Sequence, residues 1–133
     1  MKLIFCIDSK NGMMFFGKRQ SQDKGLREWI LNYVQGSKLW MSSYSSKQFG
    51  DVSAILVDND YMSKAEENDF CFIEDGVYSI DNAEEIILCK CNRHYPADKF
   101  FDVDLKSLGF KKAKSADIVG NSHEKITIEI YRR

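Results

Sequence analysis

Three short segments of the chain are apolar throughout, without the alternation of apolar and polar positions that marks a strand with one face in water. They are Leu3–Ile7, Phe70–Ile73 and, after its first residue, Glu85–Cys89. Continuous apolar runs of this length are typical of strands buried on both faces, as in the centre of a parallel sheet. The segment Lys125–Tyr131 does alternate, which predicts an antiparallel strand with one face exposed. The chain therefore predicts a mixed, mostly parallel sheet.

Helical patterns lie between these strand segments. Apolar residues recur at helical spacing from Ser21 or Asp23 onward, and Gly36 predicts the end of that helix. A short strand at Lys38–Met41 is followed by serines that favour a helix N-cap and one or two helical turns to Phe49. The remaining expected elements are a strand at Ala54–Val57 and a short helix within Asp60–Glu67. Residues 74–84, which connect the last two apolar runs, are too few for a crossover helix of ordinary length.

Length and composition fit a single domain over residues 1–133. A chain of 133 residues, 44% of them hydrophobic, can bury roughly two thirds of its unfolded surface. Its apolar runs are too short to span a membrane, and no signal peptide is recognised before the first strand. The cysteines lie inside apolar stretches, which favours reduced core residues over disulfides and predicts a cytoplasmic protein. The four are Cys6, Cys71, Cys89 and Cys91.

The net charge of −1 is distributed unevenly. Residues 51–85 carry eleven acidic residues and one basic residue, whereas residues 86–133 carry ten basic and six acidic residues. The acidic segment is most simply a solvated face. Alternatively, it docks the basic residues 106–114 of a second copy of the chain, which predicts a homo-oligomer. The continuous basic surface that nucleic-acid binding requires is not indicated.

Four stretches, in this order, resemble the dihydrofolate reductase family over the whole chain. LIFCIDSKNGMMFFGK resembles that family's first strand and the mobile, methionine-bearing loop after it, and KLWMSSYSSKQF resembles its strand and helix with the motif MGR.T. IILCKCNRHYPADKFF resembles a later strand and loop, and GNSHEKITIEIYRR resembles the final hairpin. The resemblance implies an α/β fold with three layers, αβα, around a mostly parallel mixed sheet whose last strand is antiparallel. It also implies that the first strand lies between the strands at Phe70–Ile73 and Glu85–Cys89.

The resemblance also identifies where a catalytic acid should lie. In that family a carboxylate early in the first helix, four residues before an aromatic residue, holds the pterin. The aromatic residue here would be Trp29, so the expected acid position is Gly25. The nearest substitutes are Asp23 and Glu28. Asp23 is the candidate catalytic residue, as a proton donor, although an acid at this position is more commonly favoured by the helix dipole.

The positions that the resemblance implies for NADPH binding carry other residues. The arginine of MGR.T would be Ser43, while Ser45 keeps a hydroxyl group where the family has threonine. The family's Gly-Gly pair, which lets the backbone approach the cofactor closely, would be Glu74 and Asp75. Attraction to the cofactor's phosphates is thus lost at Ser43, and carboxylates stand at Glu74 and Asp75. Two unit charges about 4 Å apart interact by about 1 kcal/mol in water and by several times more near a partly buried surface, so these changes weaken binding of an anionic cofactor. We therefore expect no cofactor, and NADPH in particular is disfavoured.

The remaining cleft is expected to bind a small ligand. Met13 to Phe16 would form a lid over it, and for at least two of these four residues core packing is the better interpretation. His123 is expected near the lid, and neither it nor His94 lies in a metal-ligand motif. A four-cysteine metal site is disfavoured because Cys-x-Cys on a strand has poor chelating geometry, so no metal is expected. The predicted ligand-binding residues are Met14, Phe16, Arg19, Ser21, Trp29, Tyr44, Ser45 and His123.

The sequence thus favours a binding or regulatory module that uses the scaffold of a reductase without its cofactor site. The partner bound would be a small molecule or a protein. The alternative is a divergent oxidoreductase that uses a pyridine nucleotide on a pterin-like or other small heterocyclic substrate, with Asp23 as its proton donor. The sequence does not identify the ligand.

Overall fold

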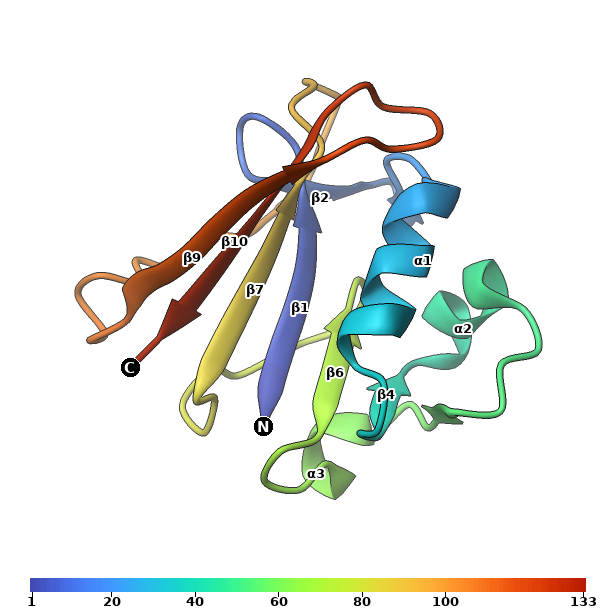
Figure 1. Cartoon of the computed structure of the whole chain (residues 1–133), viewed down its shortest axis with the longest axis vertical. Helices are drawn as coiled ribbons and strands as arrows, with labels where there is room; N and C mark the ends of the chain where they lie inside the picture. The colour runs from blue at the N-terminus through green and yellow to red at the C-terminus, as the bar shows by residue number, and fades with distance from the viewer.

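The computed structural model describes residues 1–133, and its centre is a seven-stranded sheet (Figure 1). The order of the strands across the sheet is β5-β4-β6-β1-β7-β10-β9. Their bounds are β1 Lys2–Ile7, β4 Leu39–Met41, β5 Ile55–Val57, β6 Phe70–Ile73, β7 Glu85–Lys90, β9 Lys111–Ile118 and β10 Ile126–Arg132.

The direction of the strands confirms the mixed, mostly parallel sheet expected from the sequence. β1 pairs in parallel with β6 on one side and with β7 on the other, and β4 pairs in parallel with β5 and β6. β10 runs antiparallel to β7, and β9 runs antiparallel to β10 at the edge of the sheet. The first strand is therefore flanked by the two strands that the resemblance implied.

One face of the sheet is covered by helices α1 (Lys24–Tyr33) and α2 (Ser43–Phe49) (Figure 1). Both helices pack against sheet residues of one core cluster, through Ile30 of α1, its C-cap Val34, and Phe49 of α2. Both helices begin at a side-chain cap of the expected kind: Asp23 accepts a hydrogen bond from the backbone N–H of Leu26, and Ser42 accepts one from that of Ser45.

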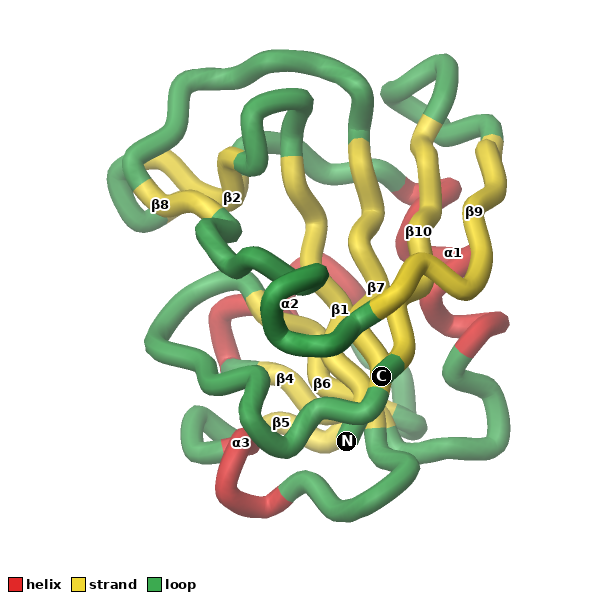
Figure 2. The backbone as a smooth tube through the Cα atoms, turned by 90° about the vertical axis from the view of Figure 1, so that its left-hand side faces the viewer, coloured by secondary structure: helices red, strands yellow, loops and turns green.

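The opposite face is covered by α3 (Tyr61–Lys64) and by segments without regular structure (Figure 2). Tyr61, Ile80 and Phe101 pack there against the odd-numbered apolar residues of β1. The connection between β6 and β7 contains no helix, as its length predicted. The outer layer on this side therefore consists of one short helix and loops. None of the three helices combines the length and the apolar character needed to cross a lipid bilayer.

The segment predicted as a lid loop is a hairpin, which corrects that expectation. β2 (Gly12–Phe15) pairs antiparallel with β3 (Lys18–Arg19) and with β8 (Lys99–Phe100) in a separate three-stranded sheet. The two turn residues, Phe16 and Gly17, have φ values of 50° and 69°, as the tightest hairpin turns require. Met13 and Met14 are buried, whereas Phe16 is 78% exposed. Core packing of two of the four lid residues is thus confirmed.

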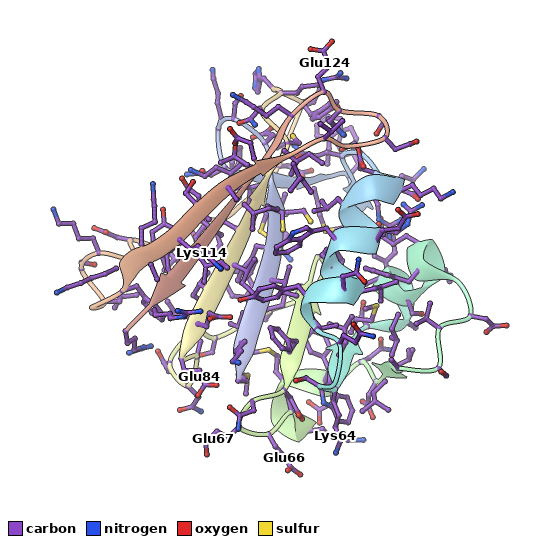
Figure 3. All side chains as sticks on the ribbon, viewed as in Figure 1. Lys64, Glu66, Glu67, Glu84, Lys114 and Glu124 are labelled. Atoms are coloured by element: carbon purple, nitrogen blue, oxygen red, sulfur yellow. The ribbon has the colours of Figure 1, made fainter.

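The acidic segment 51–85 is not only a solvated face. Asp69, Glu74 and Glu85 within it are buried, each with a partner in the fold. Its exposed acids include Glu66 and Glu67, which lie beside α3 near one end of the molecule, whereas Lys114 lies on β9 (Figure 3). Interior hydrogen bonding therefore accounts for part of the negative charge that the sequence concentrates here.

Candidate functional site

A cleft lies between α1 and the carboxyl ends of β1, β6 and β7. After β1 the chain continues to β4, on one side of β1. After β6 it passes across β1 to β7, on the other side, so the direction of the connections reverses at β1. In open α/β sheets ligands bind at such a reversal. The cavity volume is about 50 Å³, room for a few water molecules and much less than the several hundred Å³ typical of ligand sites. Its apolar floor consists of Cys6, Ile7, Met13, Leu26, Ile30, Phe72, Ile73, Cys89, Cys91 and Ile126.

Glu74, at the end of β6, forms one polar rim of the cleft together with Arg19. The Arg19 Nε lies 3.0 Å from one carboxylate oxygen of Glu74, and its Nη2 lies 3.1 Å from the other, so the pair is bidentate. Gln48 donates to the same carboxylate at 3.0 Å. The Arg19 guanidinium also lies 4.4 Å from the centre of the Tyr44 ring. The one arginine of this rim is therefore already neutralised by a carboxylate.

Asp23, immediately before α1, forms the centre of a second polar group. Its carboxylate accepts hydrogen bonds from the backbone N–H groups of Leu26, Asn121, Ser122 and His123. Burial raises the pKa of this carboxyl, but the hydrogen bonds, above all those from Asn121 and His123, outweigh burial and hold the pKa far below its ordinary value. A carboxylate that stays ionised and accepts this many hydrogen bonds is unsuited to donate a proton. The geometry thus favours capping over the catalytic role expected of Asp23.

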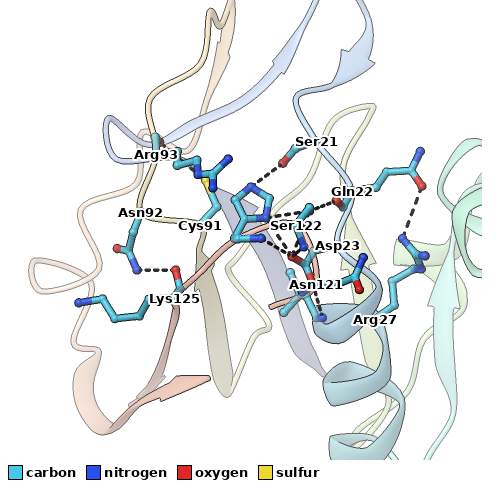
Figure 4. A network of polar contacts seen from close by, with 12 residues as sticks. Ser21, Gln22, Asp23, Arg27, Cys91, Asn92, Arg93, Asn121, Ser122 and Lys125 are labelled. Atoms are coloured by element: carbon cyan, nitrogen blue, oxygen red, sulfur yellow. Dashed lines mark hydrogen bonds and ion pairs between the residues drawn. The ribbon is translucent and has the colours of Figure 1, made fainter. Parts of the chain in front are cut away.

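His123 is buried and uses both ring nitrogens. Its Nδ1 lies 3.0 Å from Oδ2 of Asp23, which requires Nδ1 to carry the proton if the ring is neutral. Its Nε2 lies 3.0 Å from the Tyr95 hydroxyl and 3.5 Å from the Ser21 hydroxyl. Figure 4 shows Ser21 and Asp23 on the segment before α1, facing Asn121 and Ser122 of the β9–β10 turn. The carboxylate, the imidazole and the two hydroxyl groups thus form one connected chain.

The structure brings four of the nine predicted site residues to the cleft. Arg19, Ser21, Asp23 and His123 line it, whereas Met14, Trp29 and Ser45 do not. Met14 and Ser45 are buried elsewhere, and Trp29 stacks on Tyr33 along α1 with ring centres 4.9 Å apart. Tyr44 touches the site only through Arg19, and Phe16 is exposed at the hairpin tip.

Sequence reasoning missed several residues that line the cleft or contact its lining. Gln48 carries no sequence signal, because its place depends on how α2 packs. Tyr95 lies in a loop with no periodicity, and only the fold brings its hydroxyl to His123. Glu74 was singled out as a replacement for glycine, but not as an ion-pair partner of Arg19. A signal for the cysteines did exist, because Cys6 and Cys89 lie in apolar runs that were expected to form neighbouring strands, and the register pairs the two residues.

Gly25, the position expected for a pterin-binding acid, faces the β9–β10 turn. A Cβ atom there would lie 3.2 Å from the backbone nitrogen of Asn121 and 3.3 Å from the Cα of Gly120. The turn thus occupies the space into which a side chain from this position would extend. The carboxylate of Asp23, two residues earlier, is turned toward the same backbone.

The positions implied for NADPH contacts are engaged in bonds within the protein. Ser43 donates through both its backbone nitrogen and its hydroxyl to Oδ1 of Asn59. Asp75 accepts a hydrogen bond of 2.7 Å from Ser42. The Nζ of Lys99 donates to the backbone oxygens of Glu74 and Gly76. The residues present therefore do not fit a dinucleotide phosphate at these positions.

All four cysteines are free thiols, and they do not form one cluster. Cys6, Cys89 and Cys91 line the cleft, whereas Cys71 belongs to the core on the other face of the sheet. A hydrogen bond with Cys89 and burial raise the pKa of the Cys6 thiol well above its ordinary value, so this thiol is protonated and unreactive at neutral pH. No group of three or more His, Cys, Asp or Glu side chains is arranged to hold a metal ion.

Comparison with known structures identifies the fold of the chain. No family model matches the sequence, and no curated protein sequence matches it. A solved structure of dihydrofolate reductase from Enterococcus faecalis, complexed with NADP(H) and RAB-propyl, is similar to this chain with a TM-score of 0.70 and 12% sequence identity. The match covers 99% of this chain and 95% of that one. At this identity the likeness shows a dihydrofolate reductase-like fold, which is the α/β architecture that the sequence predicted.

Proposed function

We propose that the protein binds a small, uncharged ligand in the cleft beside α1 and has no pyridine-nucleotide reductase activity. The observation that carries this proposal is the state of the rim at the end of β6. There the carboxylate of Glu74 is held by Arg19 and Gln48, and that of Asp75 by Ser42. At this rim an anionic cofactor would meet these two carboxylates, and the one arginine beside them, Arg19, is already paired with Glu74 and so is not free to bind a phosphate.

The lining of the cleft supports an uncharged ligand. Its floor is apolar, and its rim carries the amide side chains of Gln20, Gln22 and Gln48. Amides donate and accept hydrogen bonds without selecting for charge. Because the free volume is about 50 Å³, binding a heterocycle requires the cleft to widen. The hairpin β2–β3 is the segment expected to move, since it contributes Met13 and Arg19 to the lining.

A thermal-shift screen of neutral heterocycles, pterins, nucleotides and NADPH tests the proposal, with calorimetry on every compound that shifts the melting temperature. A ligand present at 100 times its Kd stabilises the folded state by about 2.7 kcal/mol. The variant Leu26→Trp, which fills the cleft from α1, should abolish the shift. Glu28→Trp, at an exposed position on the same helix, is the matched control and should retain it.

A second candidate function is that of a divergent oxidoreductase acting on a pterin-like or other small heterocycle. Similarity to a reductase complexed with NADP(H), over nearly the whole chain, is the observation in its favour. Saturable binding of NADPH with a Kd below about 10 µM, together with oxidation of NADPH in the presence of a pterin, would replace the binding module with this function. If Asp23 were its proton donor, Asp23→Asn would abolish turnover while leaving NADPH bound.

A further inference from the structure

The polar chain at the edge of the cleft has the order carboxylate, imidazole, hydroxyl. The carboxylate of Asp23 accepts the Nδ1 proton of His123 at 3.0 Å, so in the neutral ring the lone pair of Nε2 points the other way. On that side the hydroxyl of Ser21 lies at 3.5 Å. Ser21 is exposed and lines the cleft, while His123 and Asp23 are buried. The packing around them therefore holds Asp23 and His123 in place, whereas Ser21 is accessible to a bound molecule.

The same geometry activates a serine in acyl-transfer enzymes on unrelated folds, where it is recognised by distances and roles and not by sequence. A serine hydroxyl is a weak nucleophile until a neighbouring base takes its proton. Asp23 fixes the tautomer and orientation of the imidazole, which makes it a positioning residue. Its lowered pKa keeps it ionised, so it stabilises the imidazolium that forms when His123 takes a proton.

We propose that Ser21 is the nucleophile of an esterase-type reaction in this cleft, with His123 as its general base. Ser21 Oγ bonds to the carbonyl carbon of a carboxylic ester as its proton passes to Nε2 of His123. The bond from that carbon to the alcohol oxygen then breaks, and the alcohol leaves with the proton. Water cleaves the acyl–serine bond by the same route, which releases the carboxylic acid and restores Ser21.

The surroundings limit the substrate class. Without widening of the cleft, the free volume of about 50 Å³ leaves room for an acyl group of only a few carbon atoms. Arg27 of α1 lines the same cavity and forms no ion pair, and its one side-chain contact is a 3.5 Å hydrogen bond to Gln22 (Figure 4). Its positive charge is therefore not neutralised within the protein, which favours a negative charge that develops in this cavity. The class that fits is a small, short-chain ester.

Tyr95 competes for the same imidazole nitrogen. Its hydroxyl lies 3.0 Å from Nε2, closer than that of Ser21. In catalysis Ser21 must replace this contact by a shift of about 0.5 Å or more, and hydrogen bonds of catalytic groups commonly tighten when substrate binds. The variant Tyr95→Phe leaves Nε2 to Ser21 alone and should raise the reactivity of Ser21.

The test is covalent labelling by a fluorophosphonate, followed by intact-mass and peptide mass spectrometry, with hydrolysis of p-nitrophenyl acetate as the turnover measurement. We expect one label per chain, located on Ser21. Ser21→Ala should lower the labelling rate by at least about 100-fold, the usual scale of general-base assistance. Ser63→Ala, at an exposed serine of α3 that does not line the cleft, should label at the rate of the unaltered protein.

Ser21→Cys gives an independent measurement that does not depend on the phosphonate. Its thiol should react with iodoacetamide at least 10 times faster than Cys91, which lines the same cavity, and His123→Gln should remove that advantage. Circular dichroism on each variant verifies that it is folded.

The proposal is overturned if the unaltered protein stays unlabelled, if the label is on Tyr95, or if Ser21→Ala labels at the original rate. This inference rests on the proposed ligand-binding cleft, but the two can fail separately. A protein that binds heterocycles and is not labelled keeps the binding function and loses the esterase. A protein that is labelled on Ser21 and binds nothing in the thermal-shift screen keeps the esterase activity and loses the binding function.

Discussion

The Asp23 carboxylate and the His123 imidazole lie 3.0 Å apart, although 100 residues separate them in the chain. This contact fastens the turn between the last two strands to the beginning of the first helix. It also determines which face of His123 is turned toward the cleft. Because the contact is buried and reinforced by four backbone N–H groups, it organises both the stability of this end of the molecule and the chemistry available there.

Replacing Asp23 by Ala should destabilise the protein by about 3 kcal/mol. The change removes a helix cap, worth about 1 kcal/mol, and leaves buried N–H donors and His123 without their acceptor. Urea unfolding measures the loss. Asp60→Ala is the matched control, because Asp60 precedes α3 without making a side-chain cap bond, and it should change the stability by less than about 0.5 kcal/mol. Equal effects of the two changes would contradict this role of Asp23.

Glu129 should make the stability fall in acid. Burial raises the pKa of its carboxyl, but hydrogen bonds from Lys90, Lys112 and Tyr131 outweigh burial and lower the pKa to about 2 from 4.5. A carboxyl with a lowered pKa in the folded state stabilises that state at pH above 4.5, and this contribution is lost as the pH falls toward 2.

The variant Glu129→Gln should therefore be less stable than the unaltered protein by about 2 kcal/mol at neutral pH. The two should approach the same stability near pH 2. Urea unfolding at a series of pH values compares them. A difference that stays constant from neutral pH to acid would show that the loss is one of packing alone.

Gly120→Ala should destabilise the turn by about 1 to 3 kcal/mol through overpacking. A Cβ atom at this position would lie 2.5 Å from Oδ2 of Asp23 and 2.8 Å from the backbone oxygen of His123. Gly25→Ala is the graded comparison, since its closest contact is 3.2 Å and alanine gains helix propensity there. Thermal unfolding should therefore rank Gly120→Ala well below Gly25→Ala, and the reverse order would contradict the packing.

Phe16→Asn should stabilise the hairpin by about 0.5 kcal/mol, as measured by thermal unfolding. Phe16 has a φ of 50° beside Gly17 at 69°, and Asn-Gly is the preferred pair in such a turn. The contact between the Phe15 and Phe16 rings, whose centres are 4.2 Å apart, is lost at the same time. A net destabilisation would mean that this contact outweighs the backbone preference.

The charge pattern predicts self-association that weakens in salt. Basic residues of the segment 106–114 lie on and before the edge strand β9, and the exposed acids of residues 51–85 include those near α3. We expect sedimentation velocity to show a homo-oligomer at low ionic strength that dissociates as salt screens the contact. The double variant Lys111→Glu and Lys114→Glu should be monomeric in both conditions. A salt-independent mass would contradict this prediction.

The sequence by itself determined the architecture of the protein. Uninterrupted apolar runs such as Leu3–Ile7 can bury both faces only in the middle of a sheet, and the alternation in Lys125–Tyr131 suits a strand with one wet face. Caps and stops are equally local. The first helix was expected to start at Ser21 or Asp23, and its cap is Asp23; Gly36 predicted its end, and the helix ends at Tyr33, shortly before that glycine. Core packing of at least two of the residues Met13 to Phe16 was also expected from the sequence, but only the fold decided that these are Met13 and Met14.

Only the tertiary structure decided what the cleft contains. Asp23 is a helix cap in the sequence, but the turn at residues 120–123 converts it into the partner of His123. The same fold places Tyr95 and Ser21 at the other nitrogen of that ring, and it turns Trp29 and Ser45 away from the cleft. Such contacts join residues far apart in the chain, and their distances depend on how the strands and helices pack. For that reason no local pattern of residues can predict them.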